Sequence, residues 1–344
     1  MSNFVRIAGC PVVYGISFMG FSGIYHQASP LRQFLFLMFL LITLLIFSTL
    51  IGLLMLVPFY GVSVIEKFST LSDYSDPKVI GLLKYFQVVN QLGMLVLPAL
   101  VFAWLVDTAP FVYLRAHKSP GWRNLLLATL FVFASMPVIG WLVDLNETMR
   151  LPFWLKGMEQ WMKSAEANAA KITDAFLATS TLGGLAINIL MIAILPAIGE
   201  EFLFRGVFMR LFCRWFRNNH AGVWLAAFIF SAIHMQFYGF IPRLLLGAAF
   251  GYLFIWSGNI WVPVSAHFVQ NATSVMVAWL ASNGTISATA DDFGQTDNML
   301  IIAASAILVA IFLYLVYKRR KPAAEIEVSD ADYSLRYPQM QDKL

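Results

Sequence analysis

Two adjacent carboxylates and an arginine lie inside a long apolar stretch of this sequence. Glu200 and Glu201 follow residues 186–196, which read AINILMIAILP, and Arg205 lies four positions after Glu201. A charged side chain at the centre of a membrane-spanning helix costs at least about 2.5 kcal/mol. We therefore expect such residues to be paired, to face a protein interior or to take part in chemistry.

Helical geometry separates the two carboxylates. Glu201 and Arg205 lie on one face of a helix and can form an ion pair. Glu200 is about 100° around the helix axis from Glu201, so it is expected to point elsewhere, toward water and a reacting group. The first three predicted helices and the last one add no comparable charge to the membrane interior.

Two later segments repeat this spacing of four with residues that can do chemistry. They carry Phe230 with His234, and His267 with Asn271. A glutamate and a histidine can activate water as a general base, and a second histidine with an asparagine amide can donate hydrogen bonds to an oxyanion. Glu200, His234, His267 and Asn271 therefore provide the groups needed to hydrolyse a peptide bond. Glutamate and histidine are also zinc ligands, so Glu200, His234 and His267 are candidate metal ligands, although no His-x-x-x-His pair is present.

The composition is that of a membrane protein. Of the 344 residues, 59% are hydrophobic and 12% are charged, whereas soluble domains carry about 25% charged residues. Several apolar runs reach the roughly 20 residues that cross a bilayer as a helix. We therefore predict an all-α, polytopic transmembrane helix bundle with about eight spans. Cys10 and Cys213 lie far apart in the sequence and indicate neither a disulfide framework nor a thiolate metal site.

Apolar runs and helix breakers place the expected helices. They cover residues 34–59, 82–106, 124–144, 182–215, 221–237, 241–257, 261–281 and 299–317. Residues 146–178 are polar but carry Trp154, Met158, Trp161 and Met162 at spacings near three and four. This pattern is typical of an amphipathic helix on the membrane surface, and an ordinary helical loop outside the membrane is the alternative.

The chain divides into four predicted regions. They are an N-terminal membrane region at 1–178, a catalytic core at 179–282, an acidic loop with the last helix at 283–317, and a polar cytoplasmic tail at 318–344. No cleavable signal peptide is expected, because the first apolar run is too long for one.

Basic residues predict the orientation in the membrane. They cluster at Arg6 and Arg32, at 115–123, at 210–217 and at 318–321. With eight spans, all four clusters fall on one side, which the positive-inside rule assigns to the cytoplasm. We expect both termini in the cytoplasm, in an integral protein of the bacterial inner membrane. Water is expected to reach Glu200 from this basic end.

The three motifs together resemble those of the CPBP intramembrane proteases. This family is named after CAAX proteases and bacteriocin-processing enzymes, is also called the Abi family, and includes the type II CAAX prenyl endopeptidases. The motifs are Glu-Glu-x-x-x-Arg at 200–205, Phe-x-x-x-His at 230–234 and His-x-x-x-Asn at 267–271. The resemblance covers about residues 180–280.

The resemblance implies a role for each motif residue. Glu200 is implied to be the catalytic glutamate that activates water together with His234. The other residues are implied to support the reaction: Glu201 and Arg205 as an orienting pair, His267 and Asn271 as oxyanion donors, and Phe230 as a packing neighbour. The family is described both as metalloproteases and as metal-free glutamate proteases, so a divalent metal such as zinc and a metal-free mechanism both stay open.

Two other functions could use the same residues. A proton- or ion-coupled transporter would use buried Glu and His as a relay, but it predicts matching polar faces in two repeated halves, which residues 1–178 lack. A non-catalytic immunity or scaffold protein would keep the fold without turnover. Arg243, near a helix end, either extends to the interface or contacts the site. The expected partners are membrane lipids and a peptide or membrane-protein substrate, with no nucleic acid.

Overall fold

The structure, a computed structural model, describes residues 22–61, 74–287 and 293–320. These residues form helices joined by loops and turns, with no β-strand among them. The all-α fold predicted from the sequence is confirmed. Within the described part Cys213 is buried and free. Predictions for Arg6, Cys10 and residues 321–344 lie outside the described ranges.

Eight long helical stretches in the described residues correspond to the eight predicted ones. They are α1 (Pro30–Tyr60); α3 (Pro77–Gln91), η2 (Leu92–Val96) and α4 (Leu97–Val106) in succession; α6 (Trp122–Glu147); α8 (Leu182–Asn188), η4 (Ile189–Ile194), α9 (Leu195–Glu201), η5 (Phe202–Met209) and α10 (Arg210–Phe216) in succession; α11 (Asn219–Ile233); α12 (Phe240–Ser257); α13 (Trp261–Ser282); and α14 (Met299–Lys318). The short α5 (Pro110–Tyr113) follows α4, and the single turn η3 (Phe153–Leu155) precedes α7 (Lys156–Leu177).

Six of these stretches are long and apolar enough to cross a membrane. They are residues 30–60, 77–106, 122–147, 182–216, 240–257 and 299–318. The chain is therefore a polytopic, integral membrane protein. The apolar α11 is shorter, and α13 packs against α6, α9 and α12. The total of eight spans stays a prediction.

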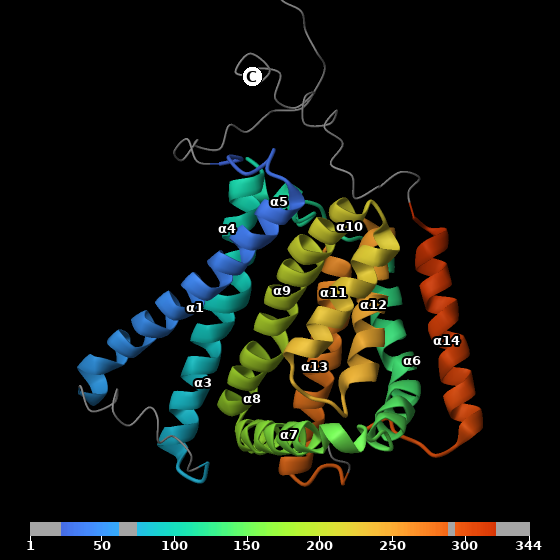
Figure 1. Cartoon of the computed structure of the whole chain (residues 1–344). Coiled ribbons are helices and arrows are strands. Elements are labelled where there is room, and N and C mark those ends of the chain that lie inside the picture. The colour runs from blue at the N-terminus through green and yellow to red at the C-terminus, as the bar shows by residue number, and fades with distance from the viewer. Residues whose placement is uncertain (1–21, 62–73, 288–292, 321–344) are drawn as a thin grey trace, which may run out of the picture.

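The basic clusters share one end of the bundle. Figure 1 shows α5, α10 and the last turn of α14 at the same end, and these elements adjoin Arg115, Arg210 to Arg217 and Lys318 to Arg320. This is the arrangement that the distribution of Lys and Arg predicts. The assignment of this end to the cytoplasm stays a prediction.

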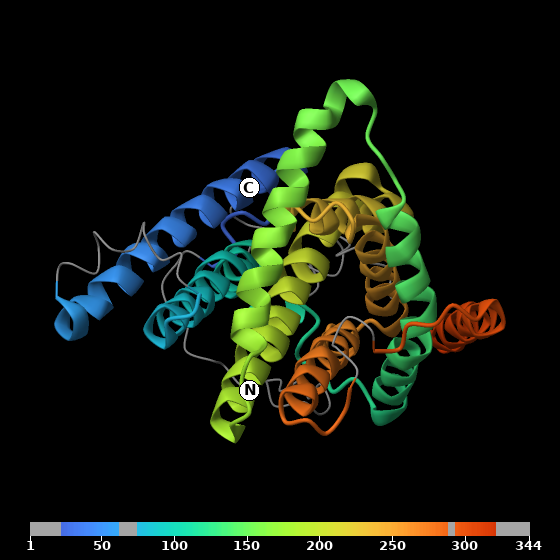
Figure 2. The same cartoon turned by 90° about the horizontal axis from the view of Figure 1, so that it is seen from below.

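The helix α7 lies across the opposite end of the bundle (Figures 1 and 2). The aromatic side chains of Phe153, Trp154 and Trp161 are exposed there. Lys84 holds α7 to the bundle, because its Nζ donates to the carbonyl oxygen of Phe176 at 2.8 Å. An amphipathic helix with exposed aromatic side chains, lying across the end of membrane helices, is the arrangement expected at a membrane surface.

The helix that carries the Glu pair departs from α-helical geometry on both sides of it. The segments η4 and η5 are π-helical, and such segments are often found at functional sites. Pro196 has no N–H to donate to the carbonyl of Ile192. That carbonyl accepts a hydrogen bond from Nδ2 of Asn271 at 3.0 Å instead. The hydrogen bond from Asn271 thereby links α13 to the helix of the Glu pair, near Glu200.

Close backbone packing brings α3 and its continuation to the Glu pair. A Cβ atom at Gly199 would lie 2.8 Å from Cβ of Leu95 in η2. A small residue at such a position lets two membrane helices approach closely. This contact places the end of α3 beside Glu200 and makes α3 a wall of the site.

Candidate active site

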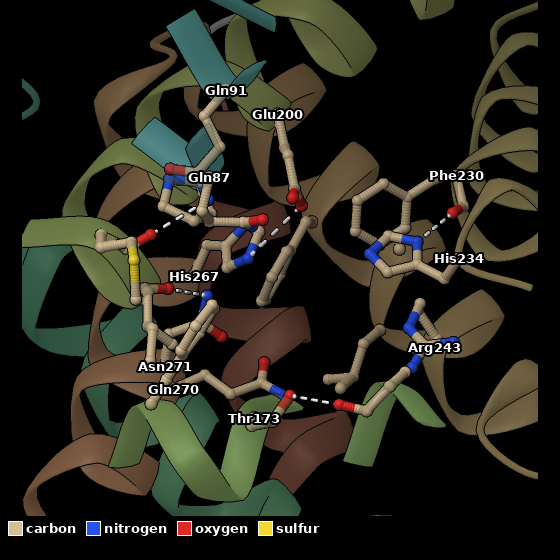
Figure 3. A pocket seen from close by; sticks show the side chains of 18 of the residues that line it. Gln87, Gln91, Thr173, Glu200, Phe230, His234, Arg243, His267, Gln270 and Asn271 are labelled. Carbon is tan, nitrogen blue, oxygen red and sulfur yellow. Dashed lines mark hydrogen bonds and ion pairs between the residues drawn. The ribbon is translucent and has the colours of Figure 1, made fainter. Parts of the chain in front are cut away.

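A pocket of about 570 Å³ lies between the helices that carry the three motifs (Figure 3). Polar side chains from five helices and from the turn after α11 line it: Gln87 and Gln91 from α3, Thr173 from α7, Glu200 from α9, His234 after α11, Arg243 from α12, and His267, Gln270 and Asn271 from α13. The three motifs, distant in the sequence, thus face one cavity inside an otherwise apolar bundle.

Glu201 is fully buried and has two partners. Its Oε1 accepts a hydrogen bond from Nη1 of Arg205 at 2.8 Å and one from Nδ1 of His267 at 2.9 Å. Arg205 also donates through Nη2 to the carbonyl of Gly247 at 3.0 Å, and its guanidinium lies 4.9 Å from the ring centre of Phe230. The expected Glu201–Arg205 pair is therefore formed, and it extends to α12 and α13.

Glu200 has a different environment, as helical geometry predicts. Its side chain is 16% exposed and lines the pocket, whereas that of Glu201 is 0% exposed. Oε2 of Glu200 lies 3.7 Å from Nε2 of His267, which is too long for a direct hydrogen bond. The two groups are neighbours at the pocket wall, where one water molecule can contact both.

The bond to Glu201 fixes how His267 can act. An ionised carboxylate only accepts hydrogen bonds, so Nδ1 of His267 is the donor to Glu201. In the neutral ring this leaves Nε2, which faces Glu200, as an acceptor. The oxyanion-donor role implied by the family resemblance therefore requires the doubly protonated ring, which lies between the carboxylates of Glu200 and Glu201.

His234 lies just beyond α11, which ends at Ile233, four residues before the predicted end at 237. Met235 has a φ of 54°, in the left-handed region that reverses the chain. Nδ1 of His234 lies 2.6 Å from the carbonyl oxygen of Phe230 and donates to it, which leaves Nε2 as an acceptor. Within the described residues, His234 shares the pocket with Glu200 but has no direct hydrogen bond or ion pair to it.

Phe230 and Asn271 support the site from two sides. The ring centre of Phe230 lies 4.8 Å from that of His234 and 6.3 Å from that of His267, so Phe230 packs against both histidines. Asn271 uses one amide hydrogen for the bond to Ile192. Its second amide hydrogen is available to a ligand in the pocket.

The three candidate metal ligands do not converge. Zinc sites in proteins use at least three protein ligands at about 2 Å. Glu200 lies 3.7 Å from His267 but forms no ion pair with His234 among the described residues. In the part of the chain that the structure describes, no group of three or more His, Cys, Asp or Glu is placed to hold a metal ion. Glu200, His234 and His267, as the structure places them, therefore do not fit a zinc site.

The helix α3 contributes polar groups to the pocket that the sequence did not single out. The prediction for the helix at 82–106 was only that it adds no charge comparable to the motif residues. However, Lys84, Gln87 and Gln91 lie at positions i, i+3 and i+7, on one face of α3, and both glutamines line the pocket. Nε2 of Gln91 donates to the carbonyl of Met191 at 3.0 Å. This spacing was the signal that could have identified them.

The direction of access also differs from the prediction. Residues 201–213 are buried throughout, and Phe204, Phe208 and Phe212 stack along them, so the protein is closed between Glu200 and the basic end. The pocket instead reaches Ala169, Thr173 and other residues of α7. The expectation that water enters from the basic end is wrong, because the aromatic stack fills that path.

Comparisons with known proteins identify the same part of the chain. Residues 182–273 match the model of a family described as "Type II CAAX prenyl endopeptidase Rce1-like". The chain is also 34% identical over 89 residues to a Bacillus subtilis (strain 168) protein named "Uncharacterized protein YpbD", a match that covers 25% of this chain and 42% of that protein. The chain thus spans less than half the length of this relative. No solved structure matches the chain.

The family match includes all three motifs. The resemblance to type II CAAX prenyl endopeptidases, seen in the motif residues, is thereby confirmed for residues 182–273. This matched segment contributes Glu200, His234, Arg243 and His267 to the pocket.

Proposed function

We propose that this protein is an intramembrane endopeptidase that hydrolyses a peptide bond with water activated at Glu200. The observation that carries the proposal is the unequal environment of the Glu pair. Glu201 accepts hydrogen bonds from Arg205 and His267. Glu200 faces the pocket, and its ion-pair partner, His267, is 3.7 Å away. A purely structural ion pair requires one carboxylate. A second carboxylate in an apolar bundle is costly, and water activation gives it a role.

The proposed reaction follows from the positions of these groups. Glu200 accepts a proton from water, and the resulting hydroxide adds to the carbonyl carbon of the scissile bond. The oxyanion that forms accepts hydrogen bonds from the free amide hydrogen of Asn271 and from protonated His267. His234 accepts a hydrogen bond from the water and orients it. Glu200 then transfers its proton to the leaving amine as the C–N bond breaks.

The match of residues 182–273 to a CAAX-protease-type family supports the same reaction class. We propose a membrane-inserted or membrane-proximal peptide as substrate, which enters from the α7 end of the bundle, in a bacterial inner membrane. The transporter alternative is less well supported, because buried residues 201–213 close the path from the pocket to the basic end. An immunity or scaffold protein with this fold would bind without cleavage.

Cleavage by purified protein tests this proposal. The full chain in lipid nanodiscs is incubated with a library of membrane-proximal and C-terminal peptides, and products are identified by mass spectrometry. Glu147→Gln is the matched control, because Glu147 is exposed and does not line the pocket. We expect wild type and Glu147→Gln to cleave the same peptides, and Glu200→Gln to lose activity by about 10²-fold or more. Cleavage that Glu200→Gln leaves unchanged would contradict the proposal.

A further inference from the structure

Arg243 is a cationic residue in the pocket that the proposed hydrolysis does not use. It lies in the first turn of α12 and lines the pocket together with Glu200 and His234, and Figure 3 shows its guanidinium beside His234. Of the two alternatives that the sequence left open, the structure shows contact with the site. Nη2 donates to Oε1 of Gln236, whereas Nη1 is buried and has no hydrogen-bond partner among the described residues.

No acidic side chain in the described residues neutralises Arg243 directly. Glu200 and Glu166 are the carboxylates whose charges act on it. Neither forms an ion pair with it, and the ion-pair partner of Glu200 is His267, at 3.7 Å. Arg243 is partly buried, and a buried donor such as its Nη1 is costly to leave without an acceptor, which a ligand from outside the protein can supply.

A second unused group in the same pocket has the opposite polarity. Oε1 of Gln91 is buried without a hydrogen-bond partner, although Nε2 of the same side chain donates to Met191. Besides the free amide hydrogen of Asn271 and the Nε2 atoms of the two histidines, the pocket therefore has a buried donor without a partner, on Arg243, and a buried acceptor without a partner, on Gln91. A peptide that carries a carboxylate satisfies both, because its backbone N–H groups donate and its carboxylate accepts.

We propose that Arg243 binds a carboxylate of the substrate, so that the pocket selects peptides with a free carboxylate near the scissile bond. A guanidinium presents N–H donors in a fork that matches a carboxylate. Because Arg243 and Glu200 line one cavity of about 570 Å³, the carboxylate lies within a few residues of the bond that is cut. The source is an Asp or Glu side chain or the peptide's own C-terminus. This inference rests on the proposed function for the role of the pocket.

Peptide binding tests the inference separately from cleavage. Short fluorescein-labelled peptides are prepared in matched pairs that differ in one carboxylate, with Asp against Asn at one position or a free C-terminus against an amide. Their dissociation constants are measured by fluorescence anisotropy with the full chain carrying Glu200→Gln, so that no peptide is consumed. Arg243→Gln and Arg243→Lys are added to this background. Arg150→Gln is the matched control, because Arg150 is exposed and does not line the pocket.

We expect the carboxylate form of a pair to bind about 10- to 100-fold more tightly than the neutral form in the background and in the Arg150→Gln control. The Arg243→Gln variant should lose this preference, and Arg243→Lys should keep part of it, which excludes misfolding as the cause. The pair that shows the effect identifies the source of the carboxylate. Equal binding of both forms, a preference that survives Arg243→Gln, or no binding of any carboxylate peptide would overturn the inference.

The two proposals can fail independently. Carboxylate preference without cleavage of the tightest peptide by wild type would contradict the endopeptidase and leave the carboxylate site in place. Cleavage by wild type without carboxylate preference would contradict the role of Arg243 alone.

Discussion

The adjacent carboxylates allow one chemical change to be made in two environments. Glu201→Gln removes the charge that balances Arg205, which is 2% exposed, and loss of one partner of a buried ion pair costs about 3–5 kcal/mol. Glu200→Gln removes a charge whose nearest partner is 3.7 Å away and whose side chain is 16% exposed, for which we expect a loss below about 1 kcal/mol. Glu201→Gln should therefore be less stable than Glu200→Gln by about 2–5 kcal/mol.

Unfolding by SDS in mixed micelles measures this difference. The free energy of unfolding of wild type, Glu200→Gln and Glu201→Gln is determined in parallel from Trp fluorescence. Glu147→Gln serves as the control for a change at an exposed glutamate. Equal losses of stability at positions 200 and 201, or a larger loss at 200, would refute the assignment of structural and reactive roles within the pair.

Three further predictions concern α7 and the metal question. Lys84→Met removes the charge-assisted hydrogen bonds of Lys84 to α7 and α8, so the free energy of opening α7 should fall by about 1.5–3 kcal/mol; unchanged hydrogen exchange in α7 would contradict this. Burial raises the pKa of Glu166, and the negative charge of Glu147 raises it slightly further. The Tyr238 N–H and the positive charge of Arg243 act in the opposite direction, but the effect of burial is the largest. The docking of α7 should therefore be strongest below the ordinary glutamate pKa and weaken as the pH rises through the raised value, which hydrogen exchange in α7 measures. The Glu166→Gln variant should abolish this pH dependence. A pH dependence that persists in the variant would exclude Glu166 as its source. Peptide cleavage should survive chelation, because the candidate ligands do not converge, and activity that is lost to a chelator and restored by zinc would show that a metal takes part.

The helices of this protein could be predicted from the sequence because its strongest signals are local. Apolar runs located the long helices to within a few residues, and the spacing of Glu201 and Arg205 indicated their ion pair. The end of α11 was misplaced, because the left-handed conformation of Met235 is not marked by Gly or Pro. The amphipathic pattern at 146–178 identified α7 but not what α7 covers.

The features that could not be predicted depend on contacts between distant segments. His267 forms a hydrogen bond with Glu201, 66 positions earlier in the chain. Asn271 donates to the carbonyl of Ile192, which has no N–H partner at Pro196. A sequence pattern shows that such groups are polar but not which partner they take. The polar face of α3 was overlooked because glutamines cost less in a membrane helix than charged residues do, so Gln87 and Gln91 carry a weaker signal.

The rate of peptide cleavage by Glu200→Gln tests the central claim most directly. With a peptide that wild type cleaves, kcat is measured at saturating concentration for wild type, Glu200→Gln and Glu147→Gln, and each protein is first shown to be folded by SDS unfolding. Activation of water by Glu200 predicts a fall in kcat of about 10²- to 10⁴-fold for Glu200→Gln and no change for Glu147→Gln. A folded Glu200→Gln protein that cleaves within about threefold of the wild-type rate would contradict the claim, because the general-base contribution would then be missing.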